Sequence, residues 1–519
     1  MEIKTNVSYM KSRRCADVYS ESAIDYILPD YHSDMRKILF TEATLRPSGR
    51  FAGGDDVELS GIIVYNVVYL DAEGDISSVE FTSDYDYSVK CSGDSYRDSI
   101  ADTRISGYNL RLVGPRKISA RASLVGSVRL SESDDRAVTG DAFDSDRSPE
   151  ICSMPIKVRQ SKLSSTVERE YAESLAKLEG AIAEEVKVVY AAAEPMVDSV
   201  SRVDCGVNVK GKLRMMAVIK NVDDVARTVE KLVGFDEIID FEGISEDMIL
   251  SPMMSVASIK TSLNADDVGC EAVMSCILEM SVVGESNGRV EVILDGYLRE
   301  CPTDNGYTDF CYTRLADCVT VKGSHNAEIA RADLESEGLR EIIFLTAAPK
   351  VERVECVDGK LTLFGEIRYS GVGSEMVGEG ITYVGIKFTS PFAVNADVNC
   401  PINEGIKLEH KLSVQGVSAV LDAEKLYASC TLECSVIVCD EQCVRTLSSM
   451  NVREGEGYKK CGGRVTVYYP TSGDTLFSVA KKFHSSGLKI AADNAIADSV
   501  FAADNPSGSL AEVKRLIIY

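Results

Sequence analysis

The sequence predicts a mainly β protein, with three tandem β-sandwich-like modules followed by a small β-α-α-β unit. Two short patterns that recur at matched distances predict the modules, and a strand, a tight turn and an amphipathic helix near the C-terminus predict the last unit. The chain has 519 residues, which is too long for one core because a domain usually takes about 100–200 residues.

The first recurring pattern is a run of alternating apolar residues around one glycine. It occupies residues 57–65, 207–215 and 361–369. A period of two with polar residues between predicts a strand that covers a core on one side. The glycines, Gly61, Gly211 and Gly365, indicate a bend or a close approach of another part of the chain.

The second pattern decides whether these matches arise by chance. Residues 275–282 and 429–436 are identical at six of eight positions, and residues 121–128 are a weaker copy. This pattern starts 64 residues after the central glycine in the second and third copies, and 60 residues after it in the first. The matched distances predict three homologous modules, at residues 31–135, 196–300 and 340–447.

The segments between the modules differ in composition. They are expected to be an N-terminal segment, a linker that contains a helix, a second linker and a glycine-rich hinge, at residues 1–30, 136–195, 301–339 and 448–463. The helix is expected over residues 167–193, because this stretch is rich in Glu, Ala, Leu and Lys.

The last unit, residues 464–519, begins with a strand that enters a tight turn at Gly473. A helix is expected next, since the side chain of Asp474 or Thr475 can accept hydrogen bonds from its free N–H groups. One face of this helix is apolar, formed by Leu476, Val479, Ala480 and Phe483. The apolar run at residues 516–518 supplies the closing strand.

The net charge of −25 argues against nucleic acid as a partner, because phosphate backbones are repelled. The chain has no apolar run typical of a secretion signal or a membrane span. We therefore expect a cytoplasmic protein that does not insert into a membrane.

The sixteen cysteines show no CxxC pair, so reduced thiols are the simplest expectation. Cys430 and Cys434 follow the inward register of a strand, whereas Cys439 and Cys443 are expected in a turn beyond it. The four histidines lack metal-ligand spacing, and no HExxH, GxSxG or phosphate-binding loop occurs. The sequence predicts no metal, no cofactor and no catalytic site.

Two regions resemble known families. Gly473-Asp-Thr-Leu476 with Val479-Ala480 resembles the opening of a LysM domain, although Leu510-Ala-Glu-Val513 replaces its usual Pro-Gly turn. Residues 114–123, together with the strands at 67–71 and 79–81, resemble the SPOCS domain. Tandem SPOCS domains with a terminal LysM domain are the architecture of the SipL-like family of spore coat morphogenesis proteins.

This resemblance implies a non-enzymatic adaptor in endospore coat assembly, located in the mother cell at the forespore surface. Its LysM-like domain would bind the coat-basement ATPase SpoIVA. The alternative is a LysM protein that binds peptidoglycan or chitooligosaccharides. In either case the expected binding residues are Gly473, Asp474, Thr475, Leu476, Lys481, Lys482 and Asn505.

Overall fold

A computed structural model of the chain describes residues 9–15, 17–53, 56–90, 96–134, 149–221, 225–265, 269–334, 336, 338–357, 360–378, 380–398, 406–453, 457–458, 465–496, 510 and 513–519. The expected mainly β class is confirmed. These described residues form 22 strands and only two α-helices.

Each of the three modules consists of two packed antiparallel sheets. Module 1 contains β1 (Tyr9–Arg14), β2 (Val18–Ile27), β3 (Met35–Gly53), β4 (Asp56–Asp71), β5 (Ile76–Lys90), β6 (Tyr96–Gly114) and β7 (Lys117–Asp134). Module 2 contains β8 (Glu150–Leu163), β9 (Val167–Glu179), β10 (Val186–Val203), β11 (Gly206–Asn221), β12 (Arg227–Asp240), β13 (Ile249–Ala265) and β14 (Gly269–Tyr297). Module 3 contains β15 (Thr303–Ala330), β16 (Leu339–Val357), β17 (Lys360–Val377), β18 (Gly380–Asp397), β19 (Ile406–Leu421) and β20 (Lys425–Val452).

The sheet topology is the same in all three modules. One sheet has the order β3-β4-β5, β10-β11-β12 or β16-β17-β18. In the other sheet the last strand of the module pairs with the opening strand and with the strand before it, as in β15-β20-β19. Modules 1 and 2 break the opening strand into two pieces, β1 with β2 and β8 with β9.

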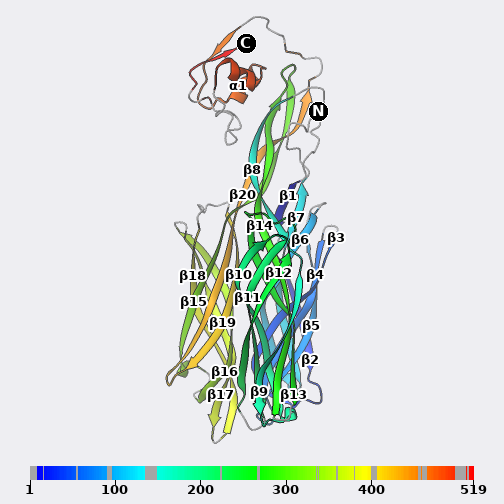
Figure 1. The fold of residues 1–519 in the computed structure, drawn as a ribbon, viewed down its shortest axis with the longest axis vertical. Coiled ribbons are helices and arrows are strands. Elements are labelled where there is room, and N and C mark those ends of the chain that lie inside the picture. The colour runs from blue at the N-terminus through cyan, green and yellow to red at the C-terminus, as the bar shows by residue number, and fades with distance from the viewer. Residues whose placement is uncertain are drawn as a thin grey trace.

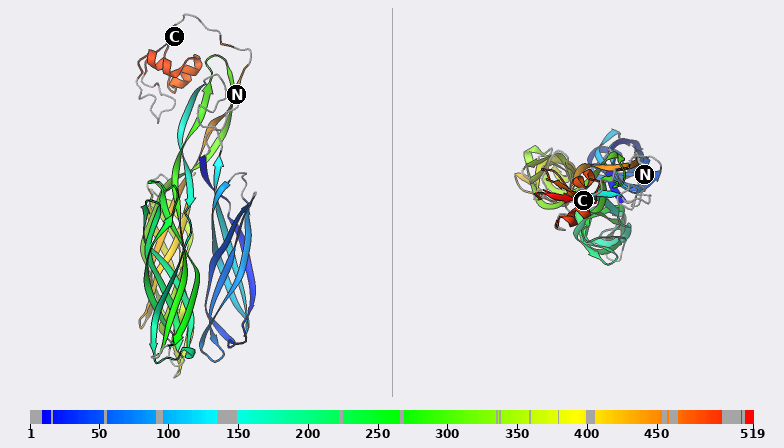
Figure 2. Two further views of the ribbon diagram at one scale, coloured as in Figure 1. Left: turned by 45° about the vertical axis from the view of Figure 1, so that its right-hand side comes forward. Right: turned by 90° about the horizontal axis from the view of Figure 1, so that it is seen from above.

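The modules lie side by side around a common centre, with their strands along the long axis of the molecule (Figures 1 and 2). The upper parts of β8, β14, β15 and β20 continue beyond the modules as a stalk, here residues 150–158, 289–315 and 439–452. Its interior contains Phe310 and Tyr312, followed by Leu447 and Met450 nearer the end. The C-terminal unit, residues 465–519, lies at the end of this stalk.

The glycine of the first sequence pattern is a point of close approach, as predicted. Gly61 pairs with Tyr85, Gly211 with Phe235, and Gly365 pairs in the same way with Phe392. A Cβ atom at Gly365 would lie 2.8 Å from the ring of Phe392 and 2.1 Å from a backbone oxygen. The aromatic ring therefore occupies the space that a side chain would need.

The helix expected over residues 167–193 is wrong, because this stretch forms β9 and β10. Val167, Tyr171 and Leu175 repeat every four residues, as in a helix, but all three also lie on one face of a strand and pack on the core of module 2. Arg169 is on the same face but about half exposed, and it bonds Glu237 of β12 at 2.9 Å. Pairing with β14 overrides the local helix preference.

The expected connections also differ from the structure. β1 and β2 lie in the predicted N-terminal segment, β8 lies in the first predicted linker, and β15 lies in the second. Each is the opening strand of a module. β20 extends to Val452, into the predicted hinge, and residues 454–456 and 459–463 of that hinge lie outside the described residues.

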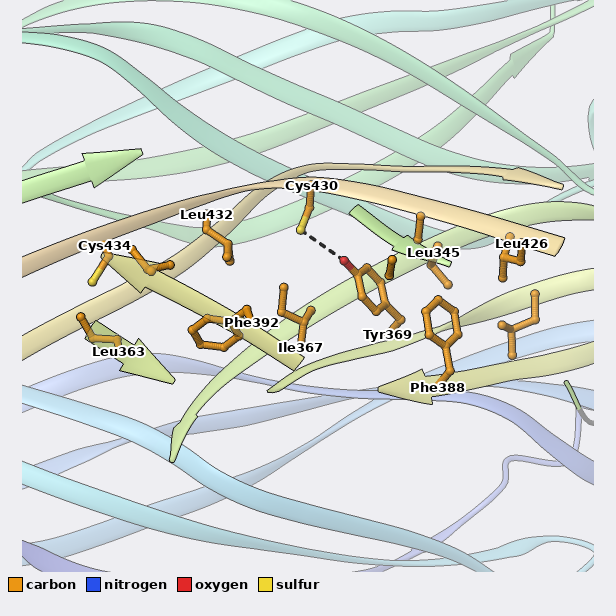
Figure 3. Close-up of a cluster of buried hydrophobic side chains, with 14 of the residues drawn as sticks. Leu345, Leu363, Ile367, Tyr369, Phe388, Phe392, Leu426, Cys430, Leu432 and Cys434 are labelled. Carbon is orange, nitrogen blue, oxygen red and sulfur yellow. Dashed lines mark hydrogen bonds between the residues drawn. The ribbon is translucent and has the colours of Figure 1, made fainter. Parts of the chain in front are cut away.

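Cysteine is a core residue of module 3, as Figure 3 shows. Cys430 and Cys434 face the interior as predicted, and the Cys430 thiol lies 3.4 Å from the hydroxyl of Tyr369. The expected turn at Cys439 and Cys443 is wrong, since β20 runs through both. Cys443 lies directly opposite Cys311 of β15 and forms a disulfide with it, so these two thiols are not reduced as expected.

An aromatic triad joins the modules near their lower ends. It consists of Phe40 of β3, Tyr190 of β10 and Phe344 of β16, one from each module. The ring centroids of Tyr190 and Phe344 are 4.7 Å apart, and the ring of Phe40 meets both edge-on. Such pairs contribute beyond simple burial, so the triad holds the three modules in one arrangement.

A central ion network joins the modules higher up, consisting of Arg129 of β7, Arg159 of β8, Glu285 of β14 and Glu409 of β19. The side chains of Arg159 and Glu285 are only 3% and 1% exposed. The Arg159 guanidinium bonds Glu285 at 2.9 Å and Glu409 at 3.0 Å, and Arg129 contacts the same two carboxylates. Burial alone would lower the pKa of Arg159, but the two glutamates raise it. The network is thus charged and crosses all three modules.

Candidate binding surface of the C-terminal unit

The C-terminal unit contains β21 (Thr466–Tyr468), α1 (Leu476–Lys482), α2 (Gly487–Asp493) and β22 (Leu516–Ile518). β21 and β22 are antiparallel, and Tyr468 lies opposite Leu516. The turn before α1 uses Gly473 in the left-handed region, with φ of 95°, where glycine is favoured. The first predicted binding residue therefore has a backbone role.

Asp474 stabilises the turn before α1, and Thr475 caps the helix. Asp474 closes the turn by accepting hydrogen bonds from the amide of Thr471 at 2.7 Å and the hydroxyl of Tyr468 at 2.8 Å. These bonds lower its pKa. Thr475 is the helix cap, because its hydroxyl accepts from the Ser478 amide while the Ser478 hydroxyl accepts from the Thr475 amide. A cap of this kind is worth about 1 kcal/mol.

Leu476, expected as a binding residue, is a core residue with 1% exposure. It packs with other apolar side chains of the unit, namely Val479, Ala480, Ile490, Ala491, Leu510, Leu516 and Ile518. This core also contains Tyr297, the last residue of β14. The Tyr297 hydroxyl donates to the carbonyl of Ser485 at 2.6 Å, and its ring meets Phe477 edge-on at 5.3 Å. The stalk thus completes the core of the unit.

Lys481, expected on the exposed helix face, is instead paired with Asp295 of β14. Asp295 also accepts hydrogen bonds from the Tyr307 hydroxyl at 2.8 Å and from Asn305 at 3.0 Å. Burial alone would raise the pKa of Asp295, but the bonds from Lys481 and Tyr307 outweigh it and lower the pKa. We call Asp295, Tyr297 and Lys481 the C-terminal junction.

The lowered pKa of Asp295 predicts an acid-sensitive junction. Its stabilising contribution is present above the ordinary carboxyl pKa of about 3.9. That contribution is lost as the pH falls through the lower pKa of the folded state. Hydrogen exchange of the α1 amides should therefore accelerate in acid, relative to the intrinsic rate. Asp295→Asn should exchange faster at neutral pH and respond less to acid; an equally steep response in this variant would contradict the assignment.

An exposed apolar face of the unit lies on the outer side of its two-stranded sheet. Tyr468, Leu516 and Ile518 face the core, so their neighbours face outward by strand alternation. These neighbours form the outer sheet face, which comprises Val465, Val467, Tyr469, Ile517 and Tyr519. Val467 is 51% exposed, Tyr469 is 67% exposed and Tyr519 is 64% exposed. The alternation of apolar residues around the inward Tyr468 is the signal that could have predicted this face.

The remaining two residues of the predicted binding set are Lys482 and Asn505. Lys482 is exposed, and its ammonium lies 4.9 Å from the ring centroid of Tyr468. Asn505 lies outside the described residues. Of the predicted set, Lys482 thus lies on the surface beside the sheet, whereas Gly473, Asp474, Thr475 and Leu476 build the unit, and Lys481 holds it on the stalk.

The comparisons with known proteins leave the family open. No protein-family model, curated protein or solved structure matches the chain. Within the described residues, no cluster of three or more His, Cys, Asp or Glu side chains could hold a metal ion. No helix of the described part of the chain has the length and apolar character needed to cross a membrane.

Proposed function

We propose that the chain is a non-enzymatic adaptor in endospore coat assembly, which binds the ATPase SpoIVA through its LysM-like C-terminal unit. The observation that carries this proposal is the exposed apolar outer sheet face at the end of the stalk. Contiguous exposed apolar surface is typical of protein-binding sites. Val467 and Tyr469 would be the central contacts, with Lys482 at the rim.

The stalk supports an adaptor role because it holds the unit beyond the ends of the three modules. Tyr297 of the stalk belongs to the core of the unit, and Asp295 of the stalk forms an ion pair with Lys481 of the unit. It is therefore presented in a defined orientation, which reduces the entropy lost on binding. In this proposal the protein acts in the cytoplasm of the mother cell, at the forespore surface.

A second function is favoured by one specific observation. Tyr469 and Tyr519 expose aromatic rings on the same face, and such rings can stack on the apolar faces of sugars. The alternative is therefore a protein that binds peptidoglycan or chitooligosaccharides.

A paired titration separates the two functions. The full chain is titrated with purified SpoIVA from the same organism and with soluble chitooligosaccharides. We expect SpoIVA binding, weakened about tenfold or more by Val467→Ser, and no sugar response. The matched control is Leu488→Ser, which removes a 70% exposed apolar side chain from α2 and should leave binding unchanged. Sugar binding that Tyr469→Ala abolishes, without SpoIVA binding, would establish the alternative.

A further inference from the structure

The Cys311–Cys443 disulfide lies on the exposed side of the stalk. The two cysteines are directly opposite each other on β15 and β20, and both are exposed. The neighbours of Cys311 along β15, Phe310 and Tyr312, are buried in the stalk interior. Exposure lets a thiolate of another molecule approach a sulfur atom, which thiol–disulfide exchange requires. The pair can therefore react while the protein stays folded.

Most other thiols are shielded from such a reaction. Among the free cysteines that the structure describes, only Cys205 is exposed, at the turn between β10 and β11. Burial raises the pKa of Cys434 to about 11 and that of Cys439 to about 12. Since the thiolate is the reactive form, these interior cysteines stay unreactive near neutral pH. A redox reagent that meets the folded chain therefore reaches the stalk pair and Cys205 before any buried cysteine.

The disulfide lies between module 3 and the outer stalk, which we define as residues 303–310 of β15 and 444–452 of β20. The two cysteines are 132 positions apart, and β16, β17, β18 and β19 all lie within the loop that they close. A disulfide stabilises paired strands by limiting the conformations that they reach when they separate. When it opens, the outer stalk keeps only its backbone pairing and its side-chain contacts.

A chain of side-chain contacts leads from the pair to the C-terminal unit. Arg445 is two positions from Cys443 on the same exposed face of β20, and its guanidinium carbon lies 4.4 Å from the ring centroid of Tyr307. The Tyr307 hydroxyl donates to Asp295 at 2.8 Å, and Asp295 pairs with Lys481 of α1. Loosening of the outer stalk therefore reaches the C-terminal junction, which orients the unit.

We propose that Cys311 and Cys443 form a redox switch that sets how firmly the stalk holds the C-terminal unit. A dithiol opens it: one thiolate attacks a sulfur of the pair and breaks the S–S bond, and the second thiolate resolves the mixed disulfide. The dithiol leaves as a cyclic disulfide after giving up two electrons, and its two protons end on the two cysteines. A disulfide oxidant such as oxidised glutathione takes the two electrons back and becomes two thiols.

This inference goes beyond the proposed function and applies whichever partner the C-terminal unit binds. Its test measures the stalk and not the outer sheet face, so either proposal can fail while the other stands.

The test compares the full chain treated with oxidised glutathione and the same chain treated with dithiothreitol, both at neutral pH. Alkylation followed by peptide mass spectrometry should label Cys311 and Cys443 only after dithiothreitol, with Cys434 unlabelled and circular dichroism unchanged. Hydrogen exchange of the outer stalk and of α1 should be at least about tenfold faster after reduction, whereas that of β17 should not change. Reoxidation should restore the slow exchange.

Three variants make the test specific. The double variant with Cys311→Ser and Cys443→Ser should exchange as fast as the reduced chain and should not respond to dithiothreitol. The matched control, Cys205→Ser, removes an exposed thiol elsewhere and should respond as the unchanged chain does. Tyr307→Phe removes the hydroxyl that bonds Asp295, so reduction should still accelerate exchange of the outer stalk but should have a smaller effect on α1.

Four outcomes would overturn the proposal. The first is alkylation of Cys311 and Cys443 in the oxidised chain, which would show two free thiols. The second is that dithiothreitol reaches the pair only in urea, which would show that the folded protein closes the site. The third is that reduction leaves the exchange of the outer stalk or of α1 unchanged. The fourth is that reduction accelerates β17 as much as the outer stalk, which would make the disulfide a general stabiliser of module 3.

Discussion

Replacing Arg159 by methionine should destabilise the protein by about 3–5 kcal/mol, because it leaves the carboxylates of Glu285 and Glu409, which are 1% and 15% exposed, with too little positive charge. Of the two arginines of the network, Arg129 alone would then remain beside Glu285 and Glu409. Glu285 is 1% exposed, so water cannot replace the lost partner. The expected observation is a clear fall in the urea concentration at which the modules unfold, followed by circular dichroism.

The control for this prediction is an exposed ion pair on the same strand as Glu409. Lys407 pairs with Glu441, and both side chains are about half exposed or more. Lys407→Met should change stability by less than about 0.5 kcal/mol. In the Arg159→Met background, Glu285→Gln should recover part of the loss, because it removes one uncompensated charge. Equal unfolding midpoints for Arg159→Met and Lys407→Met would contradict a stabilising role for the network.

The second large effect is expected at Tyr297, whose replacement by alanine should destabilise the C-terminal unit by about 3–5 kcal/mol. The ring belongs to the core of that unit although it comes from β14. Its loss should leave a cavity beside Leu476 and Phe477 and release the unit from the stalk. Hydrogen exchange of α1 and α2, followed by mass spectrometry, should accelerate while the modules remain protected.

Two other variants separate the causes. Tyr297→Phe keeps the ring and removes only the bond to the Ser485 carbonyl, so it should cost about 1 kcal/mol. Tyr519→Ala removes an exposed ring from the same unit and should leave the exchange of α1 unchanged. If Tyr297→Ala also left that exchange unchanged, the unit would be independent of the stalk. The expected dependence is the reason to measure binding with the full chain.

The sequence by itself predicted the features that depend on local periodicity and on short-range hydrogen bonds. Alternation around Gly61, Gly211 and Gly365 predicted a strand in each module, because a strand with one buried face must alternate. The matched positions of these glycines also indicated a bend or a close approach of another part of the chain, and the structure shows the close approach. The turn at Gly473 and the cap at Thr475 involve neighbouring residues, so their pattern is visible in the sequence.

Only the tertiary structure decided the features that depend on distant partners. The composition of residues 167–179 favours a helix when the segment is considered in isolation. In the folded protein these residues form strand β9, because their backbone groups pair with β14. Lys481 occupies a position expected to be exposed on the helix, yet it forms an ion pair with Asp295, which is 186 positions away in the chain. The partners of Arg159 are also distant in the chain, 126 positions away for Glu285 and 250 for Glu409. The local sequence pattern does not show which carboxylate, aromatic ring or cysteine a given side chain will contact, because the packing of whole modules determines those contacts.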